Sequence, residues 1–299
     1  MPIAVIAFDF DPLIHLGDRV LRIETLALAA VALLVIVAAA ILAGRTPPDP
    51  AIDPDAEPGD HLRRDDLMFI VLGIVPGAAI GGRLGYVLLH WDYYSRHTSA
   101  IADPSQGSLE LSMGVVVGML TGAYVARLLD GSTGRWLHVA AVPMLLGLGL
   151  GKLAMALGGD GQGTVSNLTW ATAYLGAGPW GSLAPAIPAH PSQIYEAITT
   201  GVVLLLMLML LSVGSFRRRD GRAFFVALGL WAAGRCLVAL TWRDPVVLGP
   251  FGAGQLMALV IVGLALILFL VSVRLSRAIP KPDAMGEPNW ADPAIRPPF

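Results

Sequence analysis

Seven apolar runs divide the chain and limit most strongly what it can fold into. Each is about 18–23 residues long, enough for a helix to cross roughly 30 Å of hydrocarbon at about 1.5 Å per residue. Only 14% of the 299 residues are charged, against about 25% in soluble domains. We therefore predict an all-α, polytopic membrane protein with seven transmembrane helices. The predicted spans are Thr25–Ala43, Leu67–Leu89, Leu109–Leu129, Trp136–Leu157, Ile194–Val213, Ala223–Leu240 and Gly252–Val273.

The composition excludes several other classes of protein. The formal net charge is −2 and there are only two lysines, Lys152 and Lys281, so the chain offers no basic tract for nucleic acid. The single cysteine, Cys236, lies inside an apolar run. One cysteine can form neither an intrachain disulfide nor a cysteine zinc cluster. We expect no metal site and no cofactor.

The segments around the spans have distinct compositions. We expect residues 1–24 to form an external interfacial segment, because their mixed charges do not fit a signal peptide. Residues 25–273 form the predicted seven-helix domain. Within it, the Pro- and Asp-rich residues 44–66 are typical of a disordered loop, and residues 158–193 form the longest loop on the opposite side. The Pro-rich residues 274–299 are expected to form an unstructured tail.

The distribution of lysine and arginine predicts the orientation in the membrane. Seven spans place the two termini on opposite sides. Thirteen of these residues lie on the side of the C-terminus, including the cluster Arg217–Arg222 in a short loop, and four lie on the other side. Cytoplasmic loops carry such an excess of positive charge. We therefore expect an external N-terminus, a cytoplasmic C-terminus, a cytoplasmic segment 44–66 and an external loop 158–193.

Three cations, Arg83, Lys152 and Arg235, lie inside the predicted spans. A charge at that depth costs several kcal/mol and marks a functional candidate. Each precedes the outer end of its span by five or six residues, so all three lie at one level of the outer leaflet. With few acidic partners, they favour binding of an anion, and a lipid headgroup phosphate is the anion available there. The alternative is that each long side chain lifts its charge to the interface independently.

Several segments carry a resemblance to a known family. The segment His190–Ala197, with the sequence HPSQIYEA, resembles the HPSQLYEA element of the prolipoprotein diacylglyceryl transferases. Gly82–Leu88 is similar to the second-span GARLGYVL element of that family, and Gly151–Gly163 to its signature, which runs from GR to a loop glycine. Gly234-Arg235 and Gly254–Leu256 resemble the openings of its sixth- and seventh-span motifs.

This resemblance, which covers about residues 5–275, implies a fold, an activity and partners. The family consists of seven-span enzymes of the bacterial inner membrane. They transfer the diacylglyceryl group of phosphatidylglycerol to the lipobox cysteine thiol of a preprolipoprotein, forming a thioether and releasing glycerol phosphate. The residues implied in phosphatidylglycerol binding are Arg83, Tyr86, Lys152, Gly163 and Arg235. Those implied in catalysis are Lys152, His190, Glu196 and Arg235.

The chain departs from the family pattern at several positions. Lys152 stands where the signature has arginine, which keeps the charge but loses the bidentate fork. Met155 replaces the signature asparagine, and Ala239 replaces a sixth-span glutamate. Glu24 lies near the position of a tyrosine at the entry of the first span. These changes affect the polar groups of the site, whereas the predicted spans are unaffected.

The most consequential departure is Met113, which replaces the histidine of the third-span HGG element. That histidine is thought to take the thiol proton, and methionine cannot act as a base. Either His190 or Glu196 takes over this role, or the protein has altered or lost activity. Two alternatives to the transferase are a family member that only binds anionic lipid or uses another acceptor, and a transporter. Transporters typically carry acidic or polar groups near mid-membrane, which makes the last alternative less favourable.

Overall fold

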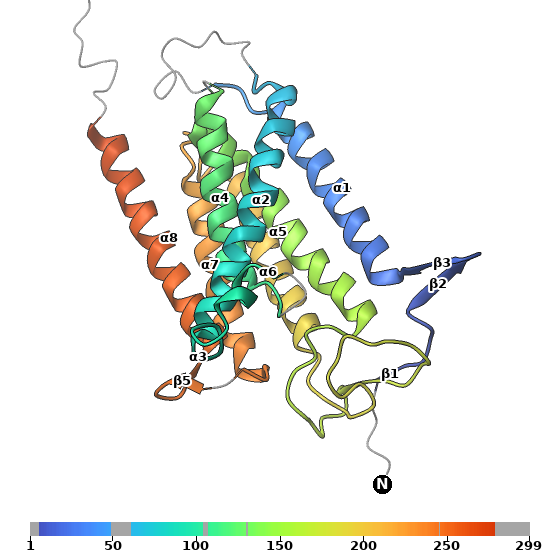
Figure 1. Ribbon diagram of the computed structural model, residues 1–299. Helices are drawn as coiled ribbons and strands as arrows, with labels where there is room; N and C mark the ends of the chain where they lie inside the picture. The colour runs from blue at the N-terminus through green and yellow to red at the C-terminus, as the bar shows by residue number, and fades with distance from the viewer. Residues whose placement is uncertain (1–5, 49–60, 104–106, 130, 245, 279–299) are drawn as a thin grey trace, which may run out of the picture.

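The computed structural model describes residues 6–48, 61–103, 107–129, 131–244 and 246–278. Within these ranges, seven helices are long and apolar enough to cross a membrane, which confirms the all-α fold with seven spans. They run roughly side by side in one bundle (Figure 1). The helices are α1 (Ile23–Ala43), α2 (Arg64–Leu89), α4 (Leu111–Leu128), α5 (Thr133–Gly158), α6 (Ser192–Ser212), α7 (Arg222–Val238) and α8 (Ala253–Ala278).

The observed helix ends lie close to the predicted ones. The largest difference is at α8, which continues to Ala278, so the first residues of the predicted tail 274–299 are helical. Likewise, α2 begins at Arg64, inside the predicted loop 44–66. Most of that loop and of the tail lie outside the described residues.

Helices α2 and α4 form the closest pair in the bundle. Their contact surfaces carry glycines at four-residue spacing, which lets helix backbones approach closely. A Cβ atom on Gly81 would lie 2.5 Å from Cβ of Val117 and 2.6 Å from the carbonyl oxygen of Met113. A Cβ atom on Gly85 would lie 2.8 Å from Cβ of Met113. The glycines therefore allow the close packing of α2 against α4.

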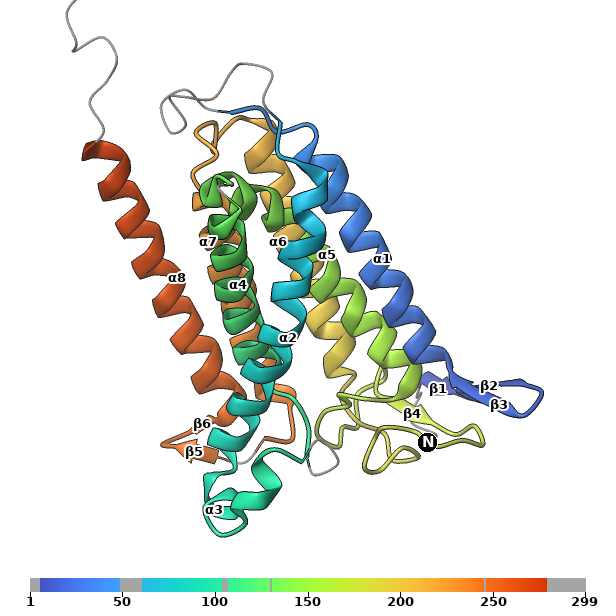
Figure 2. The same ribbon diagram turned by 45° about the horizontal axis from the view of Figure 1, so that its top comes forward.

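The other helices form a second group. Helix α1 packs along α5, α5 also contacts α6 and α7, and α7 contacts α8. Their shared core includes Leu145, Met207, Leu228 and Trp231, each at most 2% exposed. Figure 2 shows α8 at one edge of the bundle, beside α7. Helix α1 packs more closely against α5 than against α2, and α4 packs more closely against α2 than against α5. These four helices therefore border a space between the two groups.

Short strands lie at one end of the bundle, where α1 begins and α5 ends (Figures 1 and 2). The predicted interfacial segment 1–24 contributes three of them, and the first pairs in parallel with the long loop after α5. The strands are β1 (Ile6–Phe8), β2 (Leu13–Leu16), β3 (Arg19–Arg22), β4 (Thr172–Tyr174), β5 (Val246–Leu248) and β6 (Phe251–Gly252). The short helices at this end are α3 (Trp91–Tyr94), η1 (Thr98–Ile101) and η2 (Ala239–Thr241).

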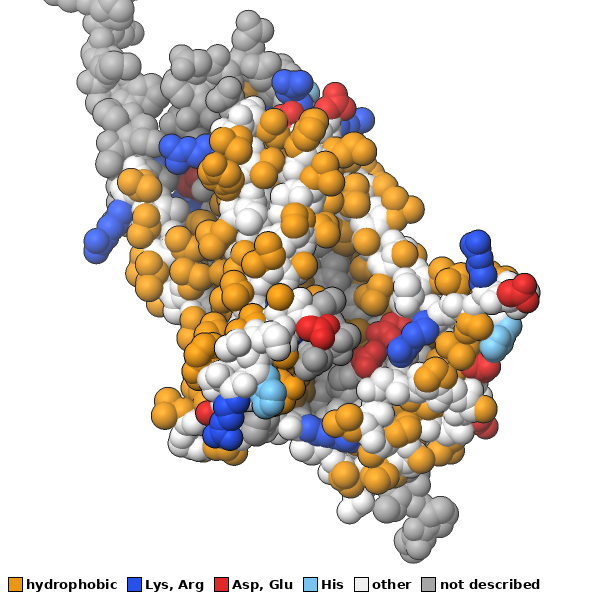
Figure 3. Space-filling view, in the orientation of Figure 1, with side chains coloured by type: hydrophobic (Ala, Val, Ile, Leu, Met, Phe, Trp, Pro, Cys, Tyr) orange, Lys and Arg blue, Asp and Glu red, His pale blue; other side chains and the backbone are white. Residues whose placement is uncertain are grey.

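The surface has the pattern expected of a protein that spans a membrane. Apolar side chains cover the long faces of the helices in Figure 3, and charged side chains gather toward the two ends of the bundle. Leu33, Leu72 and Leu205, on three different helices, are 63%, 66% and 68% exposed. Side chains of this kind are stable in contact with lipid, whereas in water they would favour aggregation.

Candidate functional site

The site is centred on Arg235, in the last turn of α7. Its guanidinium forms an ion pair with Glu196 of α6, and the two side chains are only 5% and 1% exposed. Arg235 Nε donates a hydrogen bond to Ser112 Oγ of α4 at 3.2 Å. Arg235 Nη2 lies 3.6 Å from Glu110 Oε1. Thus α4, α6 and α7 together fix one buried guanidinium.

Lys152 of α5 joins the same cluster. Its Nζ lies 3.1 Å from Glu196 Oε2, so this single carboxylate lies between two cations. Both cations also face the indole ring of Trp242, with Arg235 Cζ 4.2 Å and Lys152 Nζ 5.6 Å from the ring centroid. An aromatic face attracts positive charge. A Cβ atom on Gly254 would lie 2.6 Å from Trp242 Cζ3, so this glycine leaves room for the indole at the start of α8.

Glu110 provides the second carboxylate of the cluster and also begins α4. Its side chain accepts hydrogen bonds from the backbone N–H groups of Ser112 at 2.9 Å and Met113 at 2.7 Å. A carboxylate at a helix N-terminus satisfies N–H groups that have no partner within the helix. Lys152 interacts electrostatically with Glu110 as well as with Glu196. The cluster therefore contains two cations and two carboxylates.

Arg83 of α2 lies apart from this cluster. Its Nε donates to the carbonyl oxygen of Ile101 at 2.8 Å, and its Nη2 donates to those of Ala100 at 2.6 Å and Asp103 at 2.9 Å. Its guanidinium also lies 5.2 Å from the centroid of the Tyr94 ring. Arg83 therefore holds the end of η1 and the segment that follows it against α2.

One cavity nevertheless connects Arg83 with Lys152. It has a volume of about 990 Å³ and is lined by both cations, by Glu24 and Met155, and by residues of α1, α2 and α5. Glu24 forms an ion pair with Arg22 at 3.1 Å. This first cavity is therefore bordered by charged side chains at the end of the bundle that carries the short strands.

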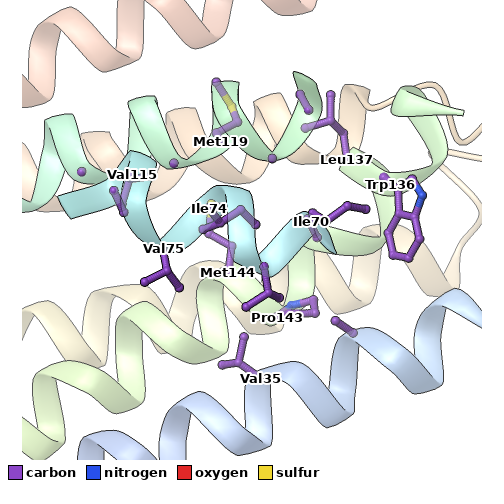
Figure 4. Close-up of a pocket in the computed structure, with 18 of the residues that line it drawn as sticks. Val35, Ile70, Ile74, Val75, Val115, Met119, Trp136, Leu137, Pro143 and Met144 are labelled. Carbon is purple, nitrogen blue, oxygen red and sulfur yellow. The ribbon is translucent and has the colours of Figure 1, made fainter. Parts of the chain in front are cut away.

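A second cavity, of about 610 Å³, occupies the space between α1, α2, α4 and α5. Figure 4 shows Val35, Ile74, Met119 and Met144 projecting around it from these four helices. The residues that line this cavity are apolar except for a few polar ones. The cavity runs from Glu110 toward Trp136 at the other end of the bundle. The two cavities adjoin, because they share the lining residues Ala79, Leu109 and Leu111.

His190 and Glu196, the two candidate bases, point to different partners. Its Nδ1 is 3.5 Å from the hydroxyl of Tyr195, whereas Glu196 points to Arg235 and Lys152. The reason is helical geometry, because residues 195 and 196 project about 100° apart on α6. The backbone of His190 has a structural role, since its carbonyl oxygen accepts a hydrogen bond from Gly163 N at 2.8 Å.

Gly163 and Tyr86 lie in the walls around the site. A side chain on Gly163 would collide with Ser192 Oγ and with the carbonyl oxygen of Thr241, so only glycine permits this close approach. The ring of Tyr86 stacks on His90 at a centroid distance of 4.2 Å. A Cβ atom on Gly107 would lie 2.5 Å from Tyr86 Cε1, so Tyr86 packs against the segment that borders the first cavity.

The long loop after α5 is anchored to the bundle by Tyr174 of β4. Its hydroxyl donates to the carbonyl oxygen of Ala156 at 3.0 Å and accepts from Gln193 Nε2 at 2.9 Å. Burial raises the pKa of Tyr174 to about 12, so the phenol stays protonated at neutral pH and keeps both bonds. This anchor fixes the loop beside the start of α6, which carries Glu196.

Sequence reasoning missed Glu110, Ser112 and Trp242. A signal for Glu110 was present, because it is an acidic residue at the start of a predicted span, three positions before Met113. That pattern is also typical of an ordinary helix cap. Ser112 and Trp242 carry no comparable signal, since their contacts with Arg235 depend on how the ends of α4 and α7 meet.

Comparison with known proteins gives a consistent result. Residues 18–271 match the family described as prolipoprotein diacylglyceryl transferase. A phosphatidylglycerol–prolipoprotein diacylglyceryl transferase of Geobacter sulfurreducens is 32% identical over 206 residues, which cover 67% of this chain and 75% of that protein. Proteins of the same name from Bordetella avium and Clostridioides difficile are 32% and 24% identical, over 74% and 67% of this chain and 83% and 75% of their own lengths.

Proposed function

This chain belongs to the prolipoprotein diacylglyceryl transferase family, and we propose that it transfers the diacylglyceryl group of phosphatidylglycerol to a lipobox cysteine. The acceptor is the thiol of a preprolipoprotein, the product is a thioether, and glycerol phosphate leaves. The membership makes the protein a transferase of lipoprotein biosynthesis with several membrane spans.

The observation that carries this proposal is a buried cation cluster beside an apolar cavity. Phosphatidylglycerol has an anionic headgroup joined to two acyl chains. Lys152 lines the first cavity, and Glu110, which neighbours Arg235, lines the apolar one. Because the two cavities adjoin, one amphipathic molecule can place its phosphate near the cations and a chain between α1, α2, α4 and α5. A soluble substrate would leave the apolar cavity unexplained.

The cations suit the chemistry of the leaving group. Negative charge develops on the phosphate oxygen as the carbon–oxygen bond breaks, and fixed positive charges lower that barrier. We assign this role to Arg235 and Lys152. The weakest contact of Arg235 is the 3.6 Å approach of Glu110, so a phosphate oxygen can replace it at the least cost. Arg83 contributes positive charge at the first cavity, and Tyr86 and Gly163 shape the surrounding walls.

The reaction also needs a proton acceptor, because the thiolate is the nucleophile. Of the two candidates from the sequence, Glu196 is bound by both cations, and we assign it the task of holding them together. His190 is half-buried and has only Tyr195 as a ring partner among the described residues, so it stays a candidate base.

We place the site on the outer side of the bacterial inner membrane. The cluster lies at the end of the bundle opposite the arginine-rich loop before α7. The excess of arginine at that other end supports a cytoplasmic position for it. The transfer would then meet its acceptor after the signal peptide has entered the membrane.

The test is transfer by the purified full chain in detergent. Phosphatidylglycerol labelled in its diacylglyceryl group is incubated with a lipobox peptide, and the modified peptide is measured by mass spectrometry. A matched peptide with serine in place of cysteine serves as the control. We expect modification of the cysteine peptide alone, and complementation of a bacterium depleted of its own transferase. Lipid binding without transfer would support the non-catalytic alternative instead.

A further inference from the structure

Glu110 lies one helical turn before Met113, at the start of α4. Met113 occupies the position of the family histidine that is thought to take the thiol proton. The Glu110 carboxylate borders the apolar cavity and also lies 3.6 Å from Arg235. It therefore stands at the junction of the two regions to which the acyl chains and the phosphate have been assigned. The reacting carbon of the lipid lies between those two parts of the molecule.

The two carboxylates of the cluster differ in how firmly they are held. Glu196 is 1% exposed and contacts Arg235 and Lys152 through separate oxygens. Glu110 is 10% exposed, and its shortest contacts are with two backbone N–H groups rather than with cations. Glu110 is thus the carboxylate that can exchange partners when a ligand enters, while Glu196 keeps the cations in place.

Charge balance gives Glu110 a reason to accept a proton. Without substrate, the two cations are balanced by Glu110 and Glu196. A bound phosphodiester adds one negative charge in surroundings that solvate charge poorly. Neighbouring like charges favour the protonated form of a carboxylate. A proton on Glu110 restores the balance, so lipid binding itself makes this group a better acceptor.

Building on the transfer reaction proposed above, we propose that Glu110 is the general base that accepts the thiol proton. The sulfur–hydrogen bond breaks and its proton moves to the carboxylate. The sulfur forms a bond to the glycerol carbon while the bond from that carbon to the phosphate oxygen breaks, and the electron pair leaves on this oxygen. Glu110 then returns its proton to the phosphate monoester. The products are the thioether and glycerol phosphate, and the base is regenerated.

A role in capping α4 predicts a different outcome from a role as base. Ser112 and Met113 donate to different oxygens of the Glu110 carboxylate, so the single amide oxygen in Glu110→Gln can keep one of these two capping hydrogen bonds. The amide cannot take up the proton. General-base catalysis contributes about 10²–10⁴-fold to a rate. We therefore expect Glu110→Gln to lower transfer to a cysteine lipobox peptide by about 100-fold or more.

A selenocysteine lipobox peptide separates proton transfer from all other effects. A selenol is already ionised near neutral pH and needs no base, so Glu110→Gln should lower its modification less than tenfold. The matched control is Asp65→Asn, which removes an exposed carboxylate from the first turn of α2 at the other end of the bundle. It should leave both rates unchanged. A second variant, Met113→His in the Glu110→Gln background, should recover cysteine transfer by at least tenfold.

Equal losses with both peptides would overturn the assignment and show that Glu110 only supports the site. Unchanged cysteine transfer in Glu110→Gln would also overturn it, while leaving the transferase function intact. Failure of the unsubstituted protein to modify either peptide, with phosphatidylglycerol present, would instead refute the transfer reaction and this assignment together.

Discussion

Glu196 and Arg235 form an ion pair between α6 and α7 that is almost completely withdrawn from solvent. Removing one member of such a pair leaves an uncompensated buried charge, at a cost of about 3–5 kcal/mol. Glu196 also contacts Lys152 at 3.1 Å. One carboxylate therefore holds two like charges side by side, where they would otherwise repel each other. In the function proposed above, this arrangement would hold positive charge in place before the phosphate binds.

Substitution of Arg235 should show whether the guanidinium binds substrate. In Arg235→Lys the charge is kept, but the Nε–H that donates to Ser112 Oγ is lost, as is the Nη2 that lies 3.6 Å from Glu110 Oε1. A lost charge-assisted hydrogen bond costs about 1.5–3 kcal/mol, so we expect turnover of phosphatidylglycerol to fall at least tenfold. Arg96→Ala, which removes an exposed cation outside the seven long helices, is the control. Similar turnover in the two variants would identify Arg235 as a structural group only.

Lys152 can be substituted so that phosphate binding is strengthened rather than weakened. Arginine at this position would restore the residue of the family signature and supply a bidentate fork to phosphate. We expect Lys152→Arg to lower the KM for phosphatidylglycerol or leave it unchanged, and Lys152→Met to raise it at least tenfold. Both variants retain the pair between Glu196 and Arg235. Equal KM values for the two variants would exclude a role of this charge in lipid binding.

The spans could be predicted because a helix in hydrocarbon needs a minimum apolar length, which is visible in the sequence. The cations at one end of the bundle could be predicted for the same reason, since Arg83, Lys152 and Arg235 interrupt apolar runs. The sequence does not predict that Lys152 and Arg235 share one buried cluster whereas Arg83 binds carbonyl oxygens. Whether Arg83 contacts Glu196 or the carbonyl oxygens at the end of η1 depends on helix rotation and on the path of the loop.

The strands and the second carboxylate were missed for a related reason. Strand β1 pairs with β4, which lies far away in the sequence, and three-residue strands leave no periodic pattern. A glutamate at the start of a span is typical of an ordinary helix cap, and Glu110 does cap α4. Its contact with Arg235 arises only because the ends of α4 and α7 meet at the same level. Such contacts are properties of packing rather than of either segment alone.

The close approach of α2 and α4 should depend on Gly81. The Cβ atom of Gly81→Ala would overlap Val117 and the backbone of Met113. Overpacking of this kind costs about 1–3 kcal/mol, so we expect a lower midpoint of thermal unfolding in detergent. Gly201→Ala in α6 is the matched control, because a Cβ atom there meets nothing within 4 Å. Helical alanine in place of glycine should stabilise that variant by about 0.5–1 kcal/mol.

The orientation can be tested by labelling single cysteines in intact cells. In a Cys236→Ala background, a cysteine at Leu183, which is 92% exposed in the long loop after α5, should react with an impermeant thiol reagent. A cysteine at Ser215, in the arginine-rich connection before α7, should react only after the membrane is permeabilised. The reverse result would place the cation cluster on the cytoplasmic side and contradict an external site.

Substitution of His190 distinguishes it from Glu110 as the base. An imidazole can accept a proton, whereas an alanine side chain cannot. If His190 were the base, transfer would be lost in His190→Ala. The structure gives its ring a contact with Tyr195, while the carboxylate of Glu196 belongs to the cation cluster. We therefore expect His190→Ala to retain transfer within about tenfold of the unsubstituted protein, with the same pH profile. Complete loss of transfer in His190→Ala, together with full activity of Glu110→Gln, would assign the proton to the histidine.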